Sequence, residues 1–436
     1  MTETPGNPPF SGTALAALLL SVSTVSAGYG IVLPILPLML LAIYGPNAAT
    51  EVARHTGLLT AVHAMALFLF APVWGWLSDG QGRRAILVIG LVGFSVSLLL
   101  ASIKPTIGAF YAERFFTGLF ASAITPVASA VITDQRGSDA WRARRLAWVS
   151  MASISGFLIG PMLSGFLATL PTVVSFGGAV ARQSYELPFL AVSILALAAA
   201  LAVHIWLPRT IASSADQIQS RPARDKDMRI IWTLRAVGLV VALGIGAFEV
   251  GLALRGNQDL GMDPRQVALM FTVCSLVMFI VQAAVFSPIM MPASTRWFIV
   301  PALITMATAL GLVPWMTAFS ALLAVVAIVA ASAGILSPIL TYWVSLEGGQ
   351  SRGAELGKQT AVSNLGQALG SLAGGSLFAS TIVAGAPFLL TSSFLAAAAV
   401  ACWQLPRRLD HARATSPRAK SHTPRHSISS ASGKSP

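Results

Sequence analysis

The sequence predicts an all-α polytopic membrane protein with twelve transmembrane helices arranged as two six-helix bundles. Of its 436 residues, 55% are hydrophobic and only 10% are charged, whereas a soluble domain has about 25% charged residues. Apolar runs long enough to cross a bilayer, which takes roughly 20 residues, recur along the whole chain. Basic residues gather in alternate loops between these runs, as they do in membrane proteins of fixed orientation.

Each predicted span is an apolar run bounded by polar or turn-forming residues. The first run is about thirty residues long and no Lys or Arg precedes Arg54, so we interpret it as a spanning helix and not as a cleaved signal peptide. Only Pro314 and the Gly385-Ala386-Pro387 turn separate the last two pairs of spans. The predicted spans are 12–41, 57–77, 85–103, 105–133, 146–170, 186–207, 232–254, 266–290, 297–316, 318–344, 359–383 and 387–405.

The basic residues predict the orientation of these spans. When loops are assigned alternately to the two sides, 22 of the 28 Lys and Arg residues fall on one side, five fall on the other, and Arg114 lies inside a span. The positive-inside rule places the basic side in the cytoplasm. We therefore expect a multi-pass protein of the cell (inner or plasma) membrane with both termini cytoplasmic.

The longest internal polar segment divides the spans into two sets of six, which is typical of transporters built from repeated bundles. The net charge of +12 does not indicate a nucleic-acid partner, because the basic residues lie between apolar runs and not on a soluble face. The expected domains are a cytoplasmic N-terminus (1–11), an N-terminal bundle (12–207), a cytoplasmic linker (208–231), a C-terminal bundle (232–405) and a disordered basic cytoplasmic tail (406–436).

A short polar segment, 75–84, lies between two apolar runs and predicts a turn at the basic side of the membrane. Its pattern resembles the loop between helices 2 and 3 of major facilitator superfamily transporters, in which the Asp and the first Arg help to latch the cytoplasmic ends of the two halves. Gly80 departs from that pattern, because many members have Arg or Lys there. The residues that would form this gating loop are Gly75, Asp79, Gly82, Arg83 and Arg84.

Two adjacent charged residues, Glu113 and Arg114, lie inside the fourth span. A charge near the bilayer centre costs about 2.5–3.5 kcal/mol on insertion scales, so both residues need partners or water. Adjacent side chains point about 100° apart on a helix. We therefore expect that the two do not simply neutralise one another and that at least one faces a cavity; the alternative is an interhelical ion pair that only fixes packing.

The spacing from Arg114 to Gly118 resembles the helix 4 motif of the same superfamily, whose Arg is thought to assist proton transfer. The region that follows is similar to tetracycline-type efflux pumps, and this similarity implies that Asp134 pairs with Arg83. The alternative for Asp134 is an ordinary carboxylate at the membrane interface.

The fifth span contains glycines spaced for close helix packing and a proline that bends the helix. This pattern resembles the antiporter signature of drug:proton exporters of the superfamily, which its symporters usually lack. Ser164 replaces one of two glycines in that signature. The alternative is generic packing in a membrane helix. The residues concerned are Gly156, Gly160, Pro161 and Gly165.

Glu249 is the other acidic residue within a span, about 27 Å along a helix that begins near Ile231. That position predicts either a proton-coupling role or simple solvation at the outer interface. His63 is expected to be a packing residue. Several related antiporters carry an acidic residue at the place that Val25 occupies here, so tetracycline-metal chelates are disfavoured as substrates and Glu113 becomes the leading proton carrier.

These patterns predict a proton-coupled secondary transporter that exports small, partly hydrophobic compounds by alternating access. Glu113 and Arg114 would exchange the proton, and Tyr29, Phe115 and Phe116 would line an apolar pocket. The alternative is a symporter that imports an organic acid or another nutrient with protons. The expected partners are the substrate, protons and the lipid bilayer, and the chain is expected to function as a monomer.

An enzyme is disfavoured because the sequence has no His/Cys/Asp cluster with metal-ligand spacing and no Gly-x-Ser-x-Gly motif. We expect no cofactor and no bound metal. Cys274 and Cys402 lie inside apolar runs without a local partner, and we interpret them as small buried side chains.

Overall fold

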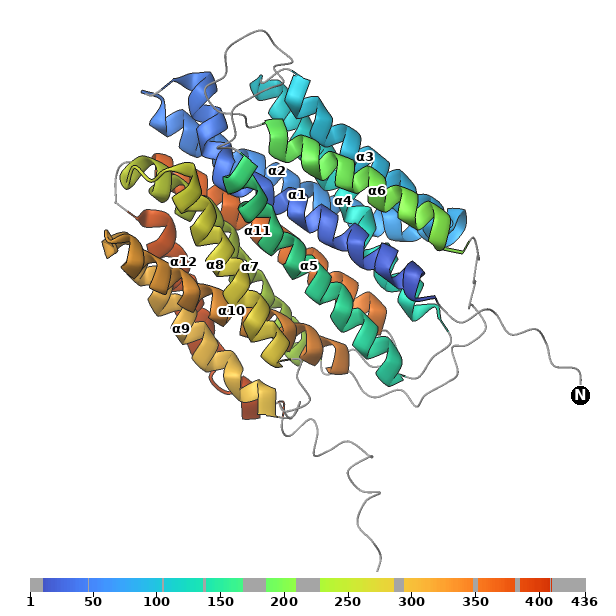
Figure 1. Ribbon diagram of the computed structural model, residues 1–436. Coiled ribbons are helices and arrows are strands. Elements are labelled where there is room, and N and C mark those ends of the chain that lie inside the picture. The colour runs from blue at the N-terminus through green and yellow to red at the C-terminus, as the bar shows by residue number, and fades with distance from the viewer. Residues whose placement is uncertain are drawn as a thin grey trace, which may run out of the picture.

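The computed structural model describes residues 11–45, 47–103, 106–135, 139–167, 186–208, 228–285, 294–347, 352–380, 385–407 and 409. Within these ranges each of the twelve predicted spans corresponds to an α-helix (Figure 1). The helices are α1 (Gly12–Tyr44), α2 (Ala49–Gln81), α3 (Arg83–Ile103), α4 (Ile107–Thr133), α5 (Asp139–Leu167), α6 (Glu186–Trp206), α7 (Met228–Leu254), α8 (Pro264–Val285), α9 (Ile299–Leu312), α10 (Phe319–Glu347), α11 (Arg352–Ala379) and α12 (Ala386–Ala401).

Several helices are longer than the hydropathy pattern predicts. Helix α2 begins at Ala49 and not near 57, and Glu51 in its first turn forms an ion pair of 2.7 Å with Arg54. Helix α7 begins at Met228, so the end of the predicted linker is helical, and it continues into a π-helical turn, Arg255–Asp259. Hydropathy marks only the part of a helix that lies in lipid, whereas polar helix ends extend beyond it. Residues 1–10, 209–227 and 410–436 lie outside the described ranges.

Ten of the described helical segments are long and apolar enough to cross a membrane. Helix α12 is apolar but shorter, with 16 residues, and α11 does not meet the hydropathy criterion. The reason for the polar character of α11 is its position, because it packs between α7 and α2. A helix that is covered by protein does not need an apolar surface toward lipid.

The two halves of the chain, α1–α6 and α7–α12, repeat one packing arrangement. In the first half, α5 contacts α1 so closely that a Cβ on Gly160 would lie 2.6 Å from the carbonyl oxygen of Ala27. In the second half, α11 contacts α7 in the same way, with Gly374 against Ala247. The equivalent contacts across the two halves are α2 with α11 and α5 with α8 (Figure 1). The two halves therefore share one pattern of helix packing, although their amino-acid sequences show little similarity to each other.

The bundle has two distinct ends. We call the end that carries Asp79, Arg83, Asp134 and the start of α7 the arginine-rich end, and the other the opposite end. Six exposed tryptophans among the described residues lie toward the arginine-rich ends of their helices, as in the aromatic belts at membrane–water boundaries. Guanidinium groups lie over some of these rings, such as Arg235 at 5.4 Å from the centre of Trp232. The six are Trp76, Trp148, Trp206, Trp232, Trp297 and Trp403.

The halves are joined at the centre and at the opposite end. Gly375 of α11 lies against α2, where its Cβ would be 2.6 Å from the Cα of Gly57. Gln258 donates a hydrogen bond to the carbonyl of Ala49, with 3.1 Å between the atoms. These contacts close the opposite end, while the cavity described below lies toward the arginine-rich end.

Candidate transport site

A buried carboxylate lies at the boundary between the two halves. Glu249 of α7 is only 7% exposed. Its Oε2 atom accepts a hydrogen bond of 2.6 Å from the Tyr29 hydroxyl of α1 and one of 3.1 Å from the Gln367 amide of α11. The same amide donates to the Tyr29 hydroxyl at 2.9 Å. Tyr29, Glu249 and Gln367, which we call the central triad, therefore connect the halves through neutral donors and one carboxylate.

Of the two alternatives for Glu249, solvation at the outer interface does not agree with its burial, and the proton-coupling role stays a prediction. Because α7 continues as a π-helical turn to Asp259, Glu249 lies about 15 Å before the end of the helical segment. Sequence reasoning did not find Gln367. Its signal was an amide among the glycines of α11, which is an unusual residue for a helix inside a membrane bundle.

Aromatic rings surround Tyr29 within the first half. The Tyr29 ring stacks on His63 of α2, with 5.3 Å between ring centres, and on Phe157 of α5, with 5.9 Å. His63 is buried, and its Nδ1 atom lies 3.3 Å from the Thr117 hydroxyl of α4. The prediction of a packing role for His63 agrees with these contacts. The ring also holds Tyr29 in place beside Glu249.

Glu113 and Arg114 neutralise one another, so the expectation that they cannot do so is wrong. Arg114 donates from Nε to Glu113 Oε2 at 2.5 Å and from its Nη2 atom to Oε1. The side chains are 1% and 3% exposed. The two Cβ atoms still point about 100° apart, but the long Arg side chain bends back far enough for its guanidinium to reach the Glu113 carboxylate. Neither residue lines the cavity described below.

The gating-loop residues form a network at the arginine-rich end. Arg83 contacts Asp79 at 2.6 Å, Asp134 at 3.1 Å, and the Ser78 hydroxyl. The predicted pair between Asp134 and Arg83 is confirmed. The segment is a turn only at Gly82, which has a positive φ of 93°, because α2 remains helical through Gln81. The network joins α2, α3 and α4, which all belong to one half, and at Gly75 and Gly80 a Cβ would meet open space.

The residues of the predicted antiporter signature contact other helices closely. A Cβ on Gly156 would overlap the Ser23 carbonyl of α1, and Pro161 lies against Gly30. Gly165 faces the other half, where its Cβ would be 2.6 Å from that of Ala268 on α8. The prediction of close helix packing is confirmed. The prediction of a functional role stays a prediction.

The predicted aromatic pocket is not assembled as expected. Phe115 packs against Phe70 and Phe116, with ring centres 5.7 and 5.5 Å apart, and Phe116 is 41% exposed. These rings form their own cluster on α2 and α4, separate from the stacking around Tyr29. Of the three predicted pocket residues, only Tyr29 is part of the central triad.

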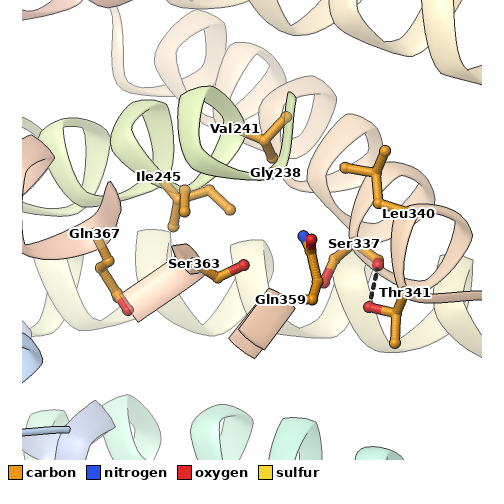
Figure 2. Close-up of a pocket in the computed structure, with 10 residues that line it drawn as sticks. Gly238, Val241, Ile245, Ser337, Leu340, Thr341, Gln359, Ser363 and Gln367 are labelled. Atoms are coloured by element: carbon orange, nitrogen blue, oxygen red, sulfur yellow. Dashed lines mark hydrogen bonds between the residues drawn. The ribbon is translucent and has the colours of Figure 1, made fainter. Parts of the chain in front are cut away.

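A cavity of about 140 Å³ lies within the second half, toward the arginine-rich end from Glu249. Figure 2 shows that its walls come from α7, α10 and α11. Gln367 belongs both to this wall and to the central triad, so one side chain connects the cavity wall with the carboxylate. Its polar lining and the glycine that faces it are Gly238, Ser337, Thr341, Gln359, Ser363 and Gln367.

Comparison with known proteins identifies similar chains. The chain is 25% identical over 375 residues to multidrug resistance protein 2 of Bacillus subtilis (strain 168), covering 84% of this chain and 89% of the relative. It is 26% identical over 406 residues to multidrug resistance protein 1 of the same organism, covering 91% and 97%. It is 24% identical over 366 residues to the quinolone resistance protein NorA of Staphylococcus aureus (strain MSSA476), covering 83% and 89%.

Solved structures with the same fold include the human organic anion transporter MFSD10, with a TM-score of 0.68 and 20% identity over 90% of this chain and 99% of that one. A bacterial homologue of the lysosomal transporter Spinster, in an inward-facing and unoccupied conformation, has a TM-score of 0.71 and 16% identity over 93% and 99%. Residues 18–347 and 236–435 match the Major Facilitator Superfamily profile. The chain is therefore a membrane transporter that belongs to the major facilitator superfamily.

Proposed function

We propose that this protein is a proton-coupled transporter that exports small, partly hydrophobic compounds from the cell by alternating access. One observation carries the proposal: the buried Glu249 carboxylate accepts its hydrogen bonds from Tyr29 of one half and Gln367 of the other. In alternating access the two halves move around a central site. A group that holds or releases a proton at that boundary can bias which end is open.

The chemistry of Glu249 supplies this bias. The ionised carboxylate only accepts hydrogen bonds, and bonds to a charged acceptor are stronger than bonds between neutral groups. A proton that binds to Glu249 neutralises it and weakens its bonds to Tyr29 and Gln367. The contact between the halves then loosens. In the opposite step the proton leaves to water and the central triad forms again.

The direction of transport rests on the relatives and on the pattern in α5. The relatives in Bacillus and Staphylococcus are multidrug and quinolone resistance proteins. By the positive-inside rule the arginine-rich end faces the cytoplasm, with both termini there. The cavity then lies on the cytoplasmic side of the central triad, which is the side from which an exporter receives its substrate.

In this proposal Glu113 takes part in a later proton-coupling step than Glu249. Arg114 occupies both oxygens of Glu113 in the present conformation. Glu113 can therefore exchange a proton only in a conformation in which Arg114 has moved away. We assign the first proton-coupling step to Glu249 and a later one to Glu113. The Asp79–Arg83–Asp134 network would act as the cytoplasmic gate when the halves approach each other at that end.

The test uses proteoliposomes and inverted vesicles with a pH dye inside. For the unmodified protein we expect inward drug accumulation in inverted vesicles coupled to proton release. Glu249→Gln keeps a hydrogen-bonding side chain but cannot exchange protons, so proton-driven export should fall at least tenfold while drug–drug exchange continues. The matched control is Glu51→Gln, an exposed carboxylate at the opposite end.

Two outcomes contradict the proposal. Full proton-driven export by Glu249→Gln would remove the coupling role of that residue. Proton uptake together with an organic acid would show that the protein is an importer.

A further inference from the structure

The side-chain oxygen of Gln359 lacks a hydrogen-bond partner among the described residues. Gln359 lies on α11 and is 4% exposed. Its Oε1 atom is buried and makes no hydrogen bond with the described residues. A buried acceptor without a partner costs about 1–3 kcal/mol, and such atoms are rare in folded proteins. Gln359 is therefore a side chain for which a ligand would supply the missing bond.

The neighbouring backbone holds this amide in place. Gly238 of α7 faces it, and a Cβ at that position would overlap the Nε2 atom of Gln359. Figure 2 shows the amide turned toward Gly238 and the hydroxyl of Ser363 on the same wall. The glycine makes room for the amide, which forms part of the cavity wall.

The cavity is large enough for one polar group of a ligand but not for a whole drug-sized molecule. Its volume of about 140 Å³ is smaller than the 300–1,000 Å³ of a site for a drug-sized ligand. Thr341 already donates to the Ser337 carbonyl at 2.9 Å, whereas the hydroxyl of Ser363 makes no hydrogen bond with the described residues. Among the described residues, no charged side chain lines the cavity. Its apolar surface comes from Val241, Ala242, Ile245 and Leu340.

We propose that Gln359 and Ser363 form a subsite that binds an amino group of the transported compound, whose apolar body remains between the two halves. The subsite rests on the proposed export function and adds a substrate class to it: lipophilic compounds that carry a hydrogen-bond-donating amino group. The N–H of that group donates to Gln359 Oε1. Gln367 lines the same cavity and donates a hydrogen bond to Glu249. A compound bound in the cavity can therefore change the hydrogen bonding of the Glu249 carboxylate.

The experiment compares two lipophilic cations. Ethidium carries two aromatic amino groups, whereas tetraphenylphosphonium carries no hydrogen-bond donor. Binding of each to the full-length protein in nanodiscs and export of each from inverted vesicles are measured for the unmodified chain and for Gln359→Met. We expect the affinity for ethidium to fall about tenfold, which corresponds to about 1.4 kcal/mol, and the affinity for tetraphenylphosphonium to stay the same.

Two further variants complete the design. Thr360→Ala is the matched control, because Thr360 is exposed on the same helix and its hydroxyl bonds to the Leu356 carbonyl. Gly238→Ala displaces the Gln359 amide without removing it and should give the same selective loss of ethidium. It keeps the test valid if Gln359→Met does not fold.

The outcomes separate the subsite from the export function. Equal losses for both cations, no loss for either, or no ethidium binding by the unmodified protein would each overturn the subsite. If both cations are exported and the variant loses affinity for both equally or for neither, the subsite is wrong but the export function still holds. Selective loss of ethidium binding without any export would support the subsite and overturn the function.

Discussion

Arg114 and Glu113 show that two adjacent buried charges on one helix can pair with each other without a third residue. Both charges are buried in α4, and each satisfies the other. Removal of one member of a buried pair leaves an uncompensated charge and typically costs 3–5 kcal/mol, whereas replacement of both costs far less. The two side chains are thus strongly coupled in stability, whatever their part in proton transfer.

We expect Arg114→Leu to lower the free energy of unfolding by about 3–5 kcal/mol. The double variant Glu113→Gln/Arg114→Leu should recover most of that loss, because no charge is left unpaired. Denaturant unfolding of the purified protein in detergent measures both. The exposed pair Glu51 and Arg54 is the control, for which changes should stay within about 1 kcal/mol. Equal stability of the single and the double variant would show that the side chains are not coupled.

At the scale of elements, glycines determine how closely the helices approach. Helix α5 lies on α1 with backbone against backbone at Gly156 and Gly160. Helix α11 lies on α7 through Gly366, Gly370 and Gly374. An added methyl group at these positions has no space and must separate the helices. This packing also explains why α11 can be polar and still form part of a membrane bundle.

Gly156→Ala should destabilise the protein by about 1–3 kcal/mol, because the new methyl group would overlap the Ser23 carbonyl. Gly108→Ala is the matched control, since a Cβ there meets nothing within 4 Å, and it should be neutral or stabilising by up to about 1 kcal/mol. Thermal unfolding of the two variants side by side gives the comparison. If Gly156→Ala were as stable as Gly108→Ala, close packing at Gly156 would not contribute to stability.

At the scale of the whole molecule, the two halves meet at the centre and at the opposite end. The central triad, the Gly57–Gly375 contact and the Gly165–Ala268 contact all lie there. The proposed transport cycle requires these contacts to separate when the substrate leaves. A covalent bond at the opposite end should therefore stop the cycle without changing the site itself.

We expect the variant Gly165→Cys/Ala268→Cys to form a disulfide. The two Cβ positions are 2.6 Å apart, and a small outward shift of the helices gives the separation of about 3.8 Å that a disulfide needs. Cys274 and Cys402 are first replaced by Ala. Oxidation should abolish export, and a reductant should restore it. The single variant Gly165→Cys is the control. Full export with the disulfide intact would show that the opposite end does not need to open.

Much of the fold could be predicted from the sequence because lipid selects for length and composition. The twelve helices follow from apolar runs, and the Asp134–Arg83 pair follows from a motif of known spacing. The candidate site was less predictable. Glu249 was placed at an interface because the end of α7 could not be located, and Gln367 was overlooked because its partners lie more than a hundred residues away in the sequence.

The sequence by itself determined that this protein spans a membrane, how many helices it has and to which superfamily it belongs. These properties depend on local composition and short motifs, which a linear chain displays directly. Only the tertiary structure decided that Tyr29, Glu249 and Gln367 meet, that Phe115 and Phe116 do not join them, and that the side-chain oxygen of Gln359 has no partner among the described residues. Those facts depend on how distant helices pack against each other, because burial and hydrogen bonding arise only when the chain is folded.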